Sequence, residues 1–177
     1  MDMLATLRRS GGIEALAREL GIPSVAAAAG TEALLPAIIA GFRQQRDTAG
    51  GGEAGLDAIV TMLEGLGGGS LAAAVMGPDA ADITPGNGVL GAIFGTKDVS
   101  RILAGQAARA TGLEPDMLKR MLPLLAMLVG GYLSARATGS GAEGSRDLAS
   151  IGTLIDASGE SHVLGDIMAM DGRLMKP

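Results

Sequence analysis

The feature that most constrains the fold of this chain is a run of three apolar segments within residues 86–132. Gly95-Thr96 and Gly112 separate the segments, and glycine is the residue that most readily adopts the positive φ at which helices end. Apolar residues recur along the segments at helical spacing, which predicts three packed helices. The run contains no histidine, no cysteine, no phosphate loop and no acids paired at catalytic spacing. It therefore predicts a helical scaffold without indicating a chemistry.

The core of this protein must be aliphatic. Apolar residues make up 47% of the 177 residues, whereas aromatic residues make up only 2%, namely Phe42, Phe94 and Tyr132. Alanine and glycine allow helix backbones to approach closely, and the length suits one domain, or one domain with a small appendage.

A first helical hairpin is predicted over residues 13–20 and 24–46. Gly21 occupies the position of a left-handed residue after the first helix, and Pro23 begins the second element. Gly30-Thr31 is a candidate interruption of the second helix, and Pro36 is expected to bend it because proline lacks the amide of a regular turn.

Apolar periodicity predicts the remaining helices of the chain. They are expected at residues 53–66, 70–76, 89–94, 96–110 and 115–134, with a loop over 77–88. Residues 138–145 read as a linker rich in small residues, followed by two short apolar segments at 148–155 and 163–174.

Two parts of the chain share the same order of helix-start and helix-stop residues. Residues 13–46 and 97–135 each contain a helix, a glycine stop, a proline start and a second helix with an internal Leu-Pro pair. These units are consistent with an internal duplication. Two unrelated hairpins that use the same common turn residues would give the same sequence pattern.

A set of short motifs relates the chain to a known family. The motifs are Leu90-Gly91 with Phe94-Gly95, the turn over residues 108–112, and Leu122-Pro123 in a long apolar helix. With these residues the chain resembles the YidB-like bacterial proteins, a domain of unknown function (937), over residues 1–135. The resemblance implies an all-α fold, a compact multi-helix bundle, in agreement with the apolar periodicity. Beyond it, the residues themselves predict a small helical C-terminal appendage over 136–177, made of a linker and a short helical tail. The resemblance brings no catalytic residues with it.

The C-terminal appendage contains a degenerate calcium loop. Its candidate ligands are Asp156, Ser158, Glu160 and Asp166. Ser161 occupies the position where such a loop needs glycine, and Ile167 occupies that of the bidentate acid. The alternative is a polar turn between two short helices. We therefore expect no metal and no cofactor, and keep weak calcium binding at 156–166 as an alternative.

Residues 106–120 resemble a DNA-binding helix-turn-helix in the spacing of their small and aliphatic residues. The basic residues available for phosphates or bases would be Arg109, Lys119 and Arg120. The whole chain carries a net charge of −5, which opposes binding to a polyanion. Two helices packed at a steep angle produce the same pattern, so nucleic-acid binding is retained only as an alternative function.

The sequence also bears on location. The longest uncharged apolar run, residues 121–135, contains Pro123 and is shorter than the roughly 20 residues of a membrane helix. We therefore expect no membrane span, and because no signal peptide is apparent at residues 1–12, we expect a cytoplasmic location.

The function that these observations favour is a non-enzymatic helical scaffold or protein–protein interaction module. Its partner is an unknown protein or a second copy of the chain, which would associate through the apolar residues 122–133. An enzyme would require a polar pocket assembled from distant acids, and the sequence gives no sign of one.

Overall fold

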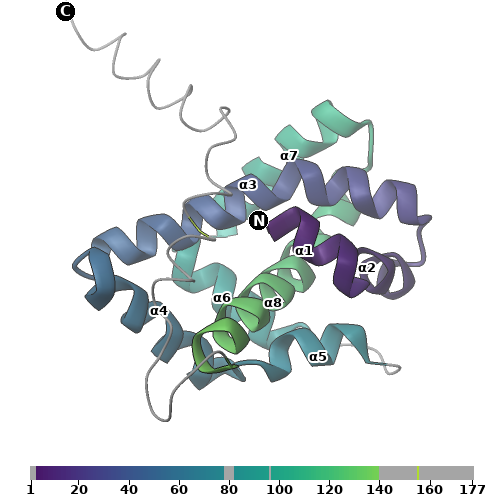
Figure 1. Ribbon diagram of the computed structural model, residues 1–177. Helices are drawn as coiled ribbons and strands as arrows, with labels where there is room; N and C mark the ends of the chain where they lie inside the picture. Colours follow the sequence, from purple (N-terminus) through teal and green to yellow (C-terminus); the bar gives the residue numbers. More distant parts are fainter. Residues whose placement is uncertain (1–2, 78–81, 96, 140–154, 156–177) are drawn as a thin grey trace, which may run out of the picture.

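The computed structural model describes residues 3–77, 82–95, 97–139 and 155, and its described part is all-α, as predicted (Figure 1). The helices are α1 (Met3–Ser10), α2 (Gly12–Leu20), α3 (Ser24–Thr48), α4 (Gly52–Leu66), α5 (Ser70–Met76), α6 (Thr84–Phe94), α7 (Lys97–Thr111) and α8 (Pro115–Gly139).

Helix α8 forms the centre of the bundle. It packs against every helix from α2 to α7, and Figure 1 shows it running through the middle of the molecule. Residues 121–131 are all buried, and Leu122, Leu125 and Leu128 are fully buried, as a helix that is apolar on all sides requires in water. The surface that we expected to mediate self-association therefore lies inside the bundle.

Glycines bring two neighbouring helices into backbone contact with α8. A Cβ atom on Gly86 of α6 would lie 2.3 Å from the carbonyl oxygen of Pro123. A Cβ atom on Gly131 of α8 would lie 2.4 Å from the backbone nitrogen of Ala72 in α5. No side chain fits at either position, so both crossings depend on glycine.

Helix α3 is continuous from Ser24 to Thr48, without the candidate interruption at Gly30-Thr31. Gly30 is buried against α8, where a Cβ atom would lie 2.7 Å from the side chain of Met121. The Thr31 hydroxyl donates a hydrogen bond of 2.7 Å to the Ala27 carbonyl of the preceding turn. This bond satisfies the buried hydroxyl, and packing against α8 holds the segment in a helix that the local sequence does not favour.

The predicted loop over residues 77–88 is too long, because α6 already begins at Thr84. The turn signal around Gly86 is overridden by the contact between this glycine and Pro123. Asp82 precedes the helix and accepts a 3.0 Å hydrogen bond from the backbone N–H of Thr84. Hydrogen bonds from the Thr84 backbone and side chain hold the pKa of Asp82 below its ordinary value.

The two predicted hairpins are built alike. Gly21 after α2 and Gly112 after α7 have φ angles of 66° and 75°, in the left-handed region where glycine is preferred. Each is followed by a helix of 25 residues with an internal proline, Pro36 in α3 and Pro123 in α8. An internal duplication remains a prediction that this likeness does not test.

The C-terminal predictions fall mainly outside the described residues. The four candidate calcium ligands and the segment 163–174 lie there, and α8 itself continues to Gly139, beyond its expected end. Ile155 is described and fully buried, and its carbonyl accepts a 3.2 Å hydrogen bond from Nη2 of Arg43 in α3.

Polar side chains, among them Arg18 and Tyr132, link helices across the bundle. Nη2 of Arg18 in α2 donates hydrogen bonds of 3.2 Å and 2.8 Å to the carbonyls of Met76 and Gly77, at the end of α5. The hydroxyl of Tyr132 in α8 lies within hydrogen-bond reach of the Ser10 hydroxyl and 3.4 Å from the Met76 sulfur. Tyr132 thereby joins α1, α5 and α8.

The expectation of no membrane span was wrong. Two helices, Ser24–Thr48 and Pro115–Ala137, are long and apolar enough to cross a membrane, and 56% and 78% of their apolar windows are buried in the bundle. A third candidate is the pair formed by α4 and α5, bent by 51°. The expectation rested on one uncharged 15-residue run, whereas the helices extend past charged residues and through their internal prolines.

The close crossing of α5 and α8 predicts the effect of two matched glycine substitutions. Gly131→Ala should lower the free energy of unfolding by about 1–3 kcal/mol, because the new methyl group overlaps the backbone of Ala72. Gly105→Ala in the interior of α7, where a Cβ atom meets no atom within 4 Å, should raise it by about 0.5–1 kcal/mol. Urea unfolding of both variants measures the difference, and equal stabilities would contradict the close crossing.

The burial of α8 predicts that two apolar-to-alanine substitutions differ in their effect on the free energy of unfolding. Leu125→Ala should lower the free energy of unfolding by about 2–5 kcal/mol, because it opens a cavity at a position with no exposed surface. Val25→Ala removes an apolar side chain that is 81% exposed and should change stability by less than about 0.5 kcal/mol. Thermal unfolding followed by circular dichroism tests both, and a small effect of Leu125→Ala would argue against a central α8.

Candidate functional site

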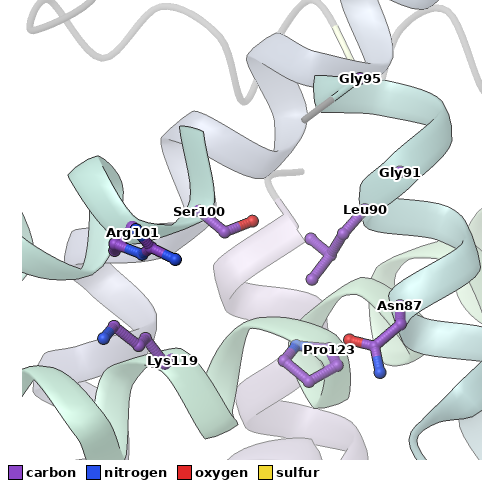
Figure 2. A pocket seen from close by; sticks show the side chains of 8 residues that line it. All are labelled: Asn87, Leu90, Gly91, Gly95, Ser100, Arg101, Lys119 and Pro123. Atoms are coloured by element: carbon purple, nitrogen blue, oxygen red, sulfur yellow. The ribbon is translucent and has the colours of Figure 1, made fainter. Parts of the chain in front are cut away.

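A cleft of about 580 Å³ opens between α6, α7 and α8, and we call it the α6–α7–α8 cleft (Figure 2). It is lined by Asn87, Leu90, Gly91, Gly95, Ser100, Arg101, Lys119 and Pro123. The volume is within the range of about 300–1,000 Å³ that is usual for ligand sites.

Glycine turns place the three helices around the cleft. Gly95 has a φ of 79°, and its N–H donates to the Gly91 carbonyl at 2.9 Å, which ends α6. Gly112 ends α7 in the same way, donating to the Ala108 carbonyl at 2.8 Å. The chain reverses at both points, so that α6, α7 and α8 pack against one another.

Two cations from different helices lie at the same end of the cleft. Figure 2 shows Arg101 of α7 and Lys119 of α8 on the same side, facing each other across the gap. Each has an acid three residues earlier on its own helix, Asp98 at 3.9 Å and Asp116 at 3.7 Å. These distances exceed hydrogen-bond length and the groups are exposed, so each pair contributes less than about 0.5 kcal/mol. An external anion can therefore replace either acid at little cost.

The part of the cleft away from the two cations has an apolar wall, with one polar side chain beside it. Leu90 and Pro123 form the apolar wall, and Figure 2 shows Asn87 beside Pro123, away from the two cations. Pro123 lies inside α8 and has no N–H, so it donates no helical hydrogen bond to the carbonyl of Lys119, four residues earlier.

Gly91 keeps one side of the cleft open. It lies in α6 and is exposed, and a Cβ atom there would meet no other atom within 4 Å. The absence of a side chain at this position is not required by packing, in contrast to Gly86, five residues earlier. A side chain at position 91 would therefore begin in open space beside the cleft, without disturbing the bundle.

The three basic residues of the predicted nucleic-acid site keep that role only as a prediction. Arg109, Lys119 and Arg120 are all exposed, but only Lys119 lines the cleft. Its partner there is Arg101, which the sequence analysis did not single out because nothing local relates two residues on different helices. Asn87 and Ser100 were missed for the same reason.

Metal sites are a separate question. Within the described part of the chain, no three or more His, Cys, Asp or Glu residues are grouped so as to hold a metal ion. The predicted calcium ligands lie outside that part.

Comparison with known proteins gives one match. The model of a family described as bacterial protein of unknown function (DUF937) matches residues 2–136. Comparisons with curated proteins and with solved structures give no match.

Proposed function

This chain belongs to the bacterial DUF937 family, whose function is unknown, and we propose that it is a non-catalytic helical interaction module whose protein partner docks in the α6–α7–α8 cleft. The observation that supports this proposal is the convergence of Arg101 and Lys119, from two helices, on one end of a cleft with an apolar wall. Protein interfaces combine an apolar centre with a polar rim, and arginine is enriched among the residues that contribute most to binding.

The cleft also suits a partner because its two cations are accessible. The side chains of Arg101 and Lys119 are 69% and 44% exposed, whereas the apolar face of α8 is buried. Binding at the cleft therefore does not require the bundle to open, and the two helices can present their cations without a conformational cost.

Site-specific photo-crosslinking in the native host tests the docking site. A benzophenone amino acid at Ser100, inside the cleft, should give a discrete protein adduct, whereas the same group at the exposed Glu53 of α4 should give several-fold less. Adding Arg101→Glu and Lys119→Glu to the Ser100 probe should abolish the adduct, because the cleft would then repel an acidic partner. Equal adducts at Ser100 and Glu53, or an adduct unaffected by charge reversal, would contradict docking in the cleft.

A membrane-bound form is a second candidate, favoured by the two helices of spanning length. Helices α3 and α8 contact each other in the bundle, and both have the length and apolarity of a membrane span. A helix of 25 residues is about 37 Å long, against an apolar bilayer core of about 30 Å. In such a form the shorter helices would leave α3 and α8 to contact lipid.

Flotation tests the membrane-bound form. The full chain mixed with vesicles of phosphatidylethanolamine and phosphatidylglycerol should float with them and remain bound after an alkaline carbonate wash. Release by high salt alone would indicate attachment through surface charge, since salt screens exposed charges. Either that release or a failure to float would contradict insertion of α3 and α8.

A further inference from the structure

We propose that Ile155 anchors the C-terminal tail of the chain to its own helical bundle, in a site beside Arg43 of α3 that we call the Ile155 socket. The socket holds the aliphatic side chain within the core and binds the Ile155 carbonyl through Arg43. Neither residue lines the α6–α7–α8 cleft, so this inference concerns a different surface and does not depend on docking there.

Ile155 lies outside the sequence that forms the bundle, yet its side chain is part of the core. The family model ends at residue 136, and α8 ends at Gly139. Ile155 has no exposed surface and belongs to the same hydrophobic cluster as the buried residues of α3 and α8. A tail that only lay on the surface would leave this side chain partly in water. Full burial of one aliphatic side chain favours the anchored form by roughly 10- to 100-fold.

Arg43 holds the backbone of the anchor. Its Nη2 atom donates to the Ile155 carbonyl at 3.2 Å, and a charged donor makes such a bond stronger than one between neutral groups. The bond also satisfies a carbonyl that burial removes from water. Ile39, one turn before Arg43 on the same face of α3, is fully buried as well. The socket therefore takes an aliphatic side chain and fixes its position through the backbone.

The occupant of the socket is the tail of the same chain, not that of a second copy. Residues 140–154 connect α8 to the anchor, and a segment of this length reaches at most about 55 Å. A domain of this size has a radius of gyration of about 14 Å, so the tether is long enough to reach the socket. Tethering raises the effective concentration of the tail to the millimolar range, above the concentration of a second copy in a micromolar solution. Another protein enters the socket only by displacing Ile155.

Two matched substitutions test the anchor in the full chain. Ile155→Ala should lower the equilibrium constant for folding by about 30-fold or more, because it opens a cavity at a fully buried position. Ile102→Ala removes the same atoms from a side chain that is 59% exposed, and it should change the constant by less than about threefold. Urea unfolding measures both constants. Equal effects of the two substitutions would overturn the inference.

A spin label locates the tail while leaving the socket intact. The chain contains no cysteine, so Gln44→Cys, at an exposed position next to Arg43, carries the label at a single site. In isotope-labelled protein this label should broaden the backbone amide resonance of Ile155. The matched control is Val25→Cys, which is also exposed and lies about 27 Å away along the same helix, and its label should broaden that resonance far less.

A mixed sample separates the two possible sources of the tail. Isotope-labelled protein without cysteine is unfolded and refolded together with unlabelled Gln44→Cys protein that carries the spin label. The Ile155 resonance should stay sharp, because each tail binds within its own chain. Broadening in the mixture would overturn the assignment in favour of a second copy. Absence of broadening even within the labelled chain would overturn the anchor altogether.

Discussion

The fold depends on the packing of α8, a helix apolar on all sides, against six neighbouring helices. Burying such a helix requires that its neighbours approach closely from every direction, and glycine makes this possible where α5 and α6 cross it, at Gly131 and Gly86. The apolar surface removed from water provides the driving force, and the missing side chains set how near the backbones come. The position of the cleft follows from this packing, because α6 and α7, which form the cleft together with Lys119 and Pro123 of α8, both pack against α8.

The composition of the core fits this arrangement. With aromatic residues at 2% of the chain, the interior is filled by aliphatic side chains and by close helix contacts. Phe42, fully buried in α3, is an exception. One polar link across the bundle lies where a helix ends, since the guanidinium of Arg18 donates to the last carbonyls of α5. Those carbonyls have no hydrogen-bond donor within their own helix. Arg18 of α2 supplies a donor, whereas water commonly supplies it at the end of a helix.

Local signals predicted the parts of the structure that local physics determines. The turns at Gly21 and Gly112 and the span of α5 follow from φ preferences and from apolar spacing over a few residues. The continuity of α3 through Gly30 and the early start of α6 at Thr84 depend on contacts with Met121 and Pro123, more than 30 residues away along the chain. The cleft was beyond sequence reasoning for the same reason, since Arg101 and Lys119 become neighbours only when α7 and α8 fold back on each other.

Tyr132 gives the molecule a tyrosine fluorescence signal that no tryptophan emission overlaps. The chain has one tyrosine and no tryptophan, so near-ultraviolet emission arises from a single phenol. That phenol touches hydroxyl and sulfur groups of α1 and α5 from its place on α8, and a neighbouring sulfur or hydrogen-bond partner alters its excited-state lifetime. Intrinsic fluorescence therefore reports, without any label, on whether these three helices remain together.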